Sequence, residues 1–152
     1  MPQRTAFAPF AMLMIAAAPP ASAQIGGGVA PPCDRACMTG IVDRYLGALV
    51  AHDPAGLPLN RDVKFTENSA RLKVGSEGLW VGASELPSGF KIYAVDVRED
   101  QVGFYDVMKE RGKPLILALR LKIVNGQITE IEAMGAQLPY GTKSGRGGVA
   151  GP

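Results

Sequence analysis

The sequence has few of the residues that metal, redox and nucleic-acid sites require. Its 152 residues include one histidine and two cysteines, and its 16 basic side chains are nearly balanced by 14 acidic ones. A structural zinc site takes about four such ligands, which this set cannot supply. Basic residues form no cluster that could follow a nucleic-acid backbone. We therefore expect no metal, no cofactor and no nucleic-acid partner.

A hydrophobic run long enough to cross a membrane is also lacking. The apolar segment Ala6–Ala18 falls short of the roughly 20 residues that a spanning helix needs. Arg4 precedes it, and the small residues Ala21–Ala23 follow it, which is the pattern of a secretory signal peptide. We predict that residues 1–23 are removed and that the protein is periplasmic or secreted, without membrane contact afterwards.

The remaining chain of about 130 residues is enough for one domain with one core. Residues 24–32 are rich in Gly and Pro and are predicted to be a flexible leader. Residues 33–137 hold the periodic segments and form the predicted domain. Residues 138–152 are dominated by Gly and cannot bury enough apolar surface to order, so a disordered tail is expected.

The two cysteines, Cys33 and Cys37, lie four residues apart at the start of a helical pattern. An even number of cysteines in an exported chain favours a disulfide. On a helix this spacing places the two α-carbons about 6 Å apart, within reach of a disulfide. A metal site would need further ligands, and a redox site favours the CxxC spacing over CxxxC. We predict a disulfide.

The segment Ile41–Asp53 organises the chain. Its apolar residues recur at three and four positions, which predicts an α-helix that buries one face. Tyr45 is the polar-tipped residue of that face, and a buried phenol needs a partner or a ligand. Asp34 could cap the helix, which is expected to run to about Ala51. Asp53 and the proline after it predict a short second helix or turn through Leu57, near the lone His52.

From Asp62 onward the hydrophobic period changes from helical to two. Val63 and Phe65 alternate with polar residues, and Glu67 falls on their apolar face, where an acid is unexpected. Further extended segments are expected at Leu79–Val81, Phe90–Val97, Val102–Met108, Pro114–Val124 and Gln127–Ala133.

A hairpin turn is predicted at Asn125-Gly126. A two-residue loop would pair Ile123 with Ile128, Leu121 with Glu130 and Leu119 with Glu132. This register places charge on both faces of the sheet. Arg120 could then be a cavity cation or a charge facing solvent or another subunit, and the sequence leaves both open.

The segment Arg44–Asp53, RYLGALVAHD, resembles the first helix of ketosteroid isomerase. The order of elements resembles the nuclear transport factor 2-like (SnoaL-like) superfamily, and the run Cys33–Cys37 is similar to an uncharacterised exported group of these domains. The resemblance implies an α+β fold, with a cone-like curved antiparallel sheet and N-terminal helices packed on its concave face. We also expect a homodimer.

The resemblance assigns roles to individual residues. Tyr45 matches the tyrosine that donates a hydrogen bond to the dienolate oxygen, and Glu67 matches the general base. The isomerase's protonated aspartate would fall near Leu117 or Ala118, which cannot donate a hydrogen bond from their side chains. This second donor is missing, which argues against ketosteroid isomerisation itself.

The predicted function is a small-molecule lyase or isomerase that acts on a hydrophobic, cyclic or aromatic substrate by acid–base catalysis. Tyr45 and Glu67 would be catalytic, unless Tyr45 is a core tyrosine and Glu67 faces solvent. The alternative is a non-catalytic binding or dimerisation module. The candidates for substrate binding, each with a structural alternative, are Trp80, Tyr93, Tyr105 and Arg120, with Asp106 weaker.

Overall fold

The structure is a computed structural model that describes residues 33–87 and 89–138. The predicted signal peptide, the leader and nearly all of the predicted tail lie outside the described residues. Two helices and seven strands make up the described part. Neither described helix has the length and apolar character that crossing a membrane requires.

Helix α1 (Arg35–Ala51) begins as the sequence predicts. The Asp34 side chain caps it by accepting a hydrogen bond from the Cys37 backbone N–H at 2.8 Å. The predicted disulfide is confirmed, since Cys33 is bonded to Cys37 with their α-carbons 5.2 Å apart. The helix therefore has its first turn fixed both by a cap and by a covalent bond.

The C-terminal end of α1 is closed by His52. This residue adopts the left-handed conformation, with φ of 57°, and its backbone N–H bonds to the carbonyls of Ala48 and Leu49. Of the short helix or turn predicted from Asp53 through Leu57, the structure has the turn. Asp53 does cap the backbone N–H of Ala55, but the chain makes only a turn there, because Gly56 and Pro58 disfavour its extension into a helix.

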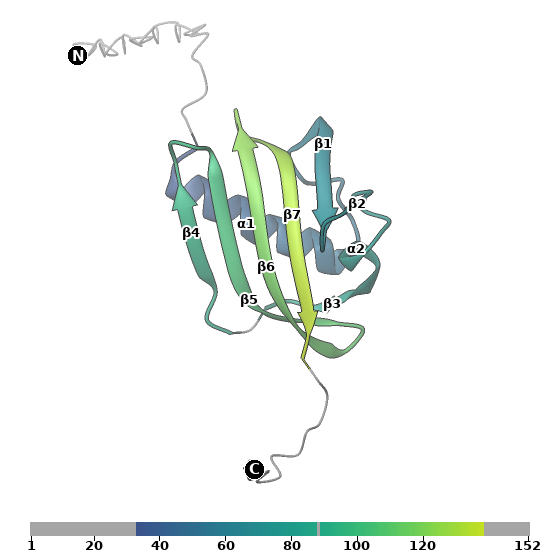
Figure 1. Ribbon diagram of the computed structural model, residues 1–152. Helices are drawn as coiled ribbons and strands as arrows, with labels where there is room; N and C mark the ends of the chain where they lie inside the picture. Colours follow the sequence, from purple (N-terminus) through teal and green to yellow (C-terminus); the bar gives the residue numbers. More distant parts are fainter. Residues whose placement is uncertain (1–32, 88, 139–152) are drawn as a thin grey trace, which may run out of the picture.

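The seven strands form one curved sheet in the order β2-β1-β7-β6-β5-β3, with β4 paired to β5 (Figure 1). The strands β1 and β7 are parallel and the other pairs are antiparallel, so the sheet is mixed and the expected all-antiparallel sheet is corrected. The sequence could not predict the parallel pair, because β1 pairs with β7, the last strand of the chain, and not with a neighbour in the sequence. The strand bounds are β1 Leu59–Glu67, β2 Ala70–Leu72, β3 Ala83–Glu85, β4 Ile92–Asp96, β5 Gln101–Glu110, β6 Lys113–Val124 and β7 Gln127–Gln137.

Helix α1 lies across one face of the sheet, which we call the inner face (Figure 1). The opposite face is the outer face. Apolar residues at alternate positions of β5, β6 and β7 pack beneath α1 into one buried core. The largest buried side chains of this core are those of Trp80, Tyr45, Phe65, Met38, Ile41, Leu46, Leu49, Met108, Leu117, Leu121, Ile123 and Ile128.

A bulge in the β6–β7 hairpin decides which face carries charge. Ile123 pairs with Ile128 as predicted, but the register then shifts, so that Leu121 opposes Ile131. The predicted pairs of Leu121 with Glu130 and of Leu119 with Glu132 are therefore wrong. The extra residue, Thr129, lets two isoleucines three positions apart both point inward. The charges of both strands consequently share the outer face.

Helix α2 (Leu79–Gly82) replaces the extended segment expected at Leu79–Val81. It is one turn long and follows Gly78, whose φ of +61° suits glycine. The Leu79 backbone N–H bonds to the side chain of Glu67, 12 residues earlier in the chain. Local periodicity cannot predict a turn whose first N–H is satisfied by a distant strand.

Candidate functional site

Tyr45 lies on the buried face of α1 and is about 1% exposed. Its ring meets the Trp80 indole edge to face, with centroids 5.4 Å apart and planes at 86°. Burial raises the pKa of Tyr45 well above its ordinary value. The indole N–H opposes that rise, and the negative charge of Glu67 adds to it. The phenol therefore stays protonated at neutral pH and keeps an O–H that can donate a hydrogen bond.

Glu67 ends β1 on the inner face, as the alternation with Phe65 predicts. Its partner in the parallel ladder is the buried Ala133. The Oε2 atom accepts a hydrogen bond from the Leu79 backbone N–H at 2.8 Å. Burial raises the pKa of the Glu67 carboxyl, the Leu79 N–H opposes that rise, and the charge of Glu110 adds to it. A carboxyl shifted toward neutrality is better suited to general-base chemistry than an ordinary one.

Trp80 lies beside these two residues, on α2. His52, at the end of α1, donates from Nδ1 to the Trp80 carbonyl oxygen at 2.7 Å. Within the described residues, the buried indole N–H of Trp80 has no hydrogen-bond partner. Tyr45, Glu67 and Trp80 thus come together from α1, β1 and α2.

Glu110 is a second carboxylate at this end of the inner face, and no pattern in the sequence predicted a role for it. It ends β5, and its Oε2 atom accepts a hydrogen bond from Gln137 Nε2 at 2.8 Å. The helix α2 fits between the two acids because the residue before it, Gly78, and its own last residue, Gly82, are both glycines. A Cβ at Gly78 would collide with the Glu67 carboxylate, and one at Gly82 would lie 2.7 Å from Glu110 Oε1.

Tyr93 and Asp106 make a separate polar group on the inner face. The Tyr93 hydroxyl donates to Asp43 Oδ1 at 2.7 Å, which links β4 to α1. Burial and the hydrogen bond to Asp43 raise the pKa of Tyr93 to about 12. Asp106 is fully buried and accepts hydrogen bonds from the backbone N–H groups of Lys91 and Val107. Both residues are committed to protein partners, unlike the Trp80 indole.

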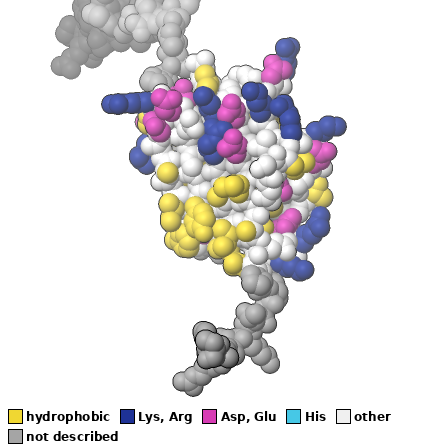
Figure 2. Space-filling view, in the orientation of Figure 1, with side chains coloured by type: hydrophobic (Ala, Val, Ile, Leu, Met, Phe, Trp, Pro, Cys, Tyr) yellow, Lys and Arg dark blue, Asp and Glu magenta, His cyan; other side chains and the backbone are white. Residues whose placement is uncertain are grey.

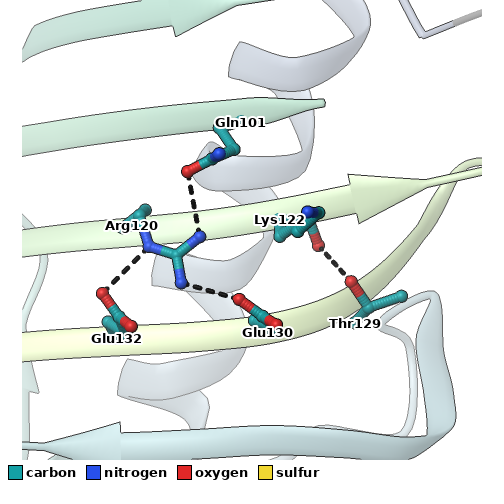
Figure 3. Close-up of polar contacts among 6 residues, drawn as sticks. All are labelled: Gln101, Arg120, Lys122, Thr129, Glu130 and Glu132. Carbon is teal, nitrogen blue, oxygen red and sulfur yellow. Dashed lines mark hydrogen bonds and ion pairs between the residues drawn. The ribbon is translucent and has the colours of Figure 1, made fainter. Parts of the chain in front are cut away.

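Arg120 lies on the outer face, on the side of the sheet opposite α1 (Figure 3). Its guanidinium bonds to Glu132 at 2.9 Å, to Glu130 at 2.8 Å and to Gln101 at 3.0 Å. These acids raise the pKa of Arg120, and the guanidinium lowers the pKa of both glutamates. We call these four residues the Arg120 cluster. It joins β5, β6 and β7 across the outer face.

Tyr105 also lies on the outer face, where it is 40% exposed and contacts Phe90 with ring centroids 6.3 Å apart. Figure 2 shows hydrophobic side chains gathered over one end of this face and charged ones over the other. A hollow of about 230 Å³ on the apolar half is lined by Ile92, Ala94, Gly103, Phe104, Tyr105, Ala118 and Leu119. The structure therefore does not bring Tyr105 or Arg120 together with Tyr45 and Glu67.

The positions where the resemblance placed a second acid donor supply none. Leu117 is fully buried among apolar side chains, and Ala118 points to the outer face. No group of three or more His, Cys, Asp or Glu side chains suited to a metal ion occurs among residues 33–87 and 89–138. The donors and acids of the inner face are thus Tyr45, Trp80, Glu67 and Glu110.

Comparison with known proteins supports the fold at low sequence identity. No family model matches the sequence, and no curated relative does. A protein from Kribbella flavida named provisionally as a ketosteroid isomerase is 13% identical, with a TM-score of 0.51 over 77% of this chain and 90% of its own. One from Xanthomonas campestris, named provisionally as a polyketide cyclase, is 18% identical, with a TM-score of 0.52 over 66% and 90%. An NTF2-like protein of unknown function from Cytophaga hutchinsonii is 11% identical, with a TM-score of 0.51 over 65% and 89%.

These likenesses confirm the fold that the sequence resemblance implied. The chain has the nuclear transport factor 2-like architecture, a curled sheet with an N-terminal helix on its inner face. Proteins named as isomerases and cyclases share it. The narrower resemblance to an exported group stays a prediction.

Proposed function

We propose that the protein is a small-molecule lyase or isomerase in which Glu67 is the general base and Tyr45 is the hydrogen-bond donor. The observation that carries the proposal is the placement of the Glu67 carboxylate, held by the Leu79 N–H, on the inner face near the buried Tyr45, and the raised pKa of Glu67 is consistent with it. A base with a raised pKa and a donor that stays protonated are what proton abstraction next to a carbonyl requires.

In the proposed reaction, the Glu67 carboxylate takes a proton from a carbon next to a carbonyl group. The electron pair of the broken C–H bond forms a C=C double bond, and negative charge develops on the carbonyl oxygen. Tyr45 donates its hydrogen bond to that oxygen. An isomerase then returns the proton to another carbon, whereas a lyase expels a leaving group. Leu79 N–H keeps one carboxylate oxygen of Glu67 in place throughout.

The surroundings favour a hydrophobic, cyclic or aromatic substrate that is uncharged. The core around Tyr45 and Trp80 is apolar, and its buried side chains include Phe65. Glu67 and Glu110 would repel a substrate with its own carboxylate or phosphate. The enolate oxygen is tolerated only once Glu67 has accepted the proton and become neutral.

Proton exchange with solvent tests this proposal without knowledge of the natural substrate. Deuterium incorporation next to the carbonyl of a cyclic ketone such as 2-tetralone is followed by NMR in D₂O. Glu67→Gln is expected to lower the enzyme-dependent rate by about 10²–10⁴-fold, which is the usual contribution of a general base. Tyr45→Phe should also slow it. Glu99→Gln, at an exposed glutamate, is the matched control and should keep the wild-type rate.

Full exchange in both Glu67→Gln and Tyr45→Phe would end the assignment of these roles.

We also propose that the protein is exported, as a disulfide is compatible with an oxidising compartment. Mass spectrometry of the secreted or periplasmic fraction should find a chain that starts near Gln24. A full-length chain confined to the cytoplasm would contradict export.

A second candidate function, a non-catalytic module that dimerises through the outer face, is favoured by the apolar half of that face. Met134 is 64% exposed, and Phe90 is 63% exposed. A homodimer needs a surface that fits a rotated copy of itself, and an apolar area bordered by charges of both signs can do so.

Light scattering should give twice the monomer mass for the wild type and the monomer mass for Met134→Lys. The control Val97→Lys, outside the hollow, should stay dimeric. A monomeric wild type would contradict the homodimer.

A further inference from the structure

The indole N–H of Trp80 is an unusual group for a protein interior. Trp80 is about 1% exposed, and within the described residues its Nε1 atom has no hydrogen-bond partner. Leaving a buried donor unpaired costs roughly 1–3 kcal/mol. Because nearly all buried polar groups are paired, an unpaired one at a candidate site marks a place where a ligand can supply the missing partner.

The unpaired N–H is not a consequence of a loosely held side chain, since the backbone of α2 is fixed at both ends. The Leu79 N–H bonds to Glu67, and the Gly82 carbonyl accepts from the Arg111 N–H at 2.7 Å. Between them, the Trp80 carbonyl accepts from His52 at 2.7 Å. The backbone that carries the indole is therefore held by contacts with α1, β1 and the β5–β6 turn, and the ring itself packs against Tyr45.

The polar group of the side chain packed against the indole, the Tyr45 hydroxyl, is also a hydrogen-bond donor. The Tyr45 ring packs edge to face with the indole at 5.4 Å, and its buried hydroxyl stays protonated. The indole N–H is close enough to the Tyr45 phenol to lower its pKa, but the two groups make no hydrogen bond of ordinary geometry, so both N–H and O–H can still donate to a ligand. That arrangement suits a single oxygen atom that carries negative charge, such as an enolate or phenolate oxygen.

We infer that the Trp80 Nε1–H and the Tyr45 hydroxyl bind one anionic oxygen of the ligand together. This inference rests on the proposed function and completes it, since Trp80 supplies the second donor that neither Leu117 nor Ala118 can give. An indole N–H does not ionise in the range where proteins are stable. This donor therefore works at any pH, whereas an acidic donor is lost when it ionises.

The experiment uses the full chain, whose Trp80 is its one tryptophan, with ¹⁵N in the indole ring. Glu67→Gln serves as the background, because the amide mimics the neutral base that accompanies the enolate. The probe is 4-nitrophenolate, and the matched ligand is 4-nitrotoluene, which has the same ring without the oxygen. We expect the indole N–H resonance to move downfield with the phenolate and not with 4-nitrotoluene.

Affinity gives the second readout. Adding Trp80→Phe to the Glu67→Gln background should weaken phenolate binding about 10-fold, the usual strength of one hydrogen bond to a charged group. Binding of 4-nitrotoluene should change much less, because phenylalanine preserves most of the ring contact. If the double variant fails to fold, the resonance shift in the Trp80 protein decides the matter alone.

An indole resonance that does not respond to bound phenolate would overturn the inference. So would equal phenolate affinity with and without the indole N–H, or no binding of phenolate to Glu67→Gln. The proposed function can fail separately. If the indole responds but proton exchange does not depend on Glu67, the donor pair stands as a binding site and the catalytic role of Glu67 falls.

Discussion

The inner and outer faces of the β5–β6–β7 sheet treat polar groups in opposite ways. On the outer face, Arg120 uses its three guanidinium nitrogens on Glu130, Glu132 and Gln101 (Figure 3). On the inner face, Trp80 has a donor without a partner, and Glu67 keeps a raised pKa. The paired charges on the outer face link β5, β6 and β7 and so help to hold the sheet together. A buried donor without a partner and a carboxyl with a raised pKa both cost stability, and they are the better candidates for function.

The largest expected effect tests whether the inner face supplies the stability. Leu121 is fully buried on that face, and its neighbour Lys122 points to the outer face. Leu121→Ala should lower the free energy of unfolding by about 2–5 kcal/mol, from lost burial and the cavity left behind. Lys122→Ala should change it by less than about 0.5 kcal/mol. Urea denaturation measures both, and comparable losses would contradict the assignment of faces.

A smaller effect is expected from breaking the Arg120 cluster. Arg120→Met leaves Glu130 and Glu132 without their cation, but these groups are partly exposed and screened, so the loss should be about 1 kcal/mol at neutral pH. The guanidinium lowers both carboxyl pKa values. Its stabilisation is therefore present above the ordinary carboxyl pKa and is lost as pH falls through the lowered values.

Thermal melts across a range of pH should show that the melting temperatures of the wild type and Arg120→Met differ at neutral pH and become equal at acid pH. A constant difference would mean that Arg120 stabilises the sheet by packing. A loss of unfolding free energy much larger than about 1 kcal/mol would mean that the ion pairs of the Arg120 cluster are not screened by solvent as expected.

The smallest expected effect has the opposite sign. Because the folded pKa of Glu67 is raised, ionising this carboxyl destabilises the folded protein as pH rises through that value. Glu67→Gln keeps an oxygen for the Leu79 N–H and removes the charge. The variant should therefore melt slightly higher than the wild type above the raised pKa, and the gap should close below the ordinary carboxyl pKa. A variant that is less stable at every pH would show that Glu67 is structural.

The sequence predicted the elements whose cause is local. The three-and-four spacing around Tyr45 predicted α1, and Asn125-Gly126 predicted the hairpin. The cap at Asp34 and the disulfide followed from residue types at the helix start. Each of these depends on neighbours along the chain.

The errors arose where a distant partner decides the outcome. The α2 turn depends on Glu67 accepting the Leu79 N–H, and the mixed sheet depends on β1 pairing with β7. The sequence left open which face Arg120 occupies, because a regular hairpin puts Glu130 opposite Leu121. The bulge at Thr129 instead places Glu130 and Glu132 on the outer face with Arg120. No local pattern marks a bulge of this kind, although the inward isoleucines at positions 128 and 131 are consistent with it.

The central claim is that Tyr45, Trp80 and Glu67 form the ligand site on the inner face. The most direct measurement is a crystal structure of Glu67→Gln with 4-nitrophenolate. We expect the phenolate oxygen within hydrogen-bond distance of both Tyr45 Oη and Trp80 Nε1, with the ring in the apolar core. Phenolate bound only in the outer-face hollow beside Tyr105, or bound nowhere, would contradict the claim.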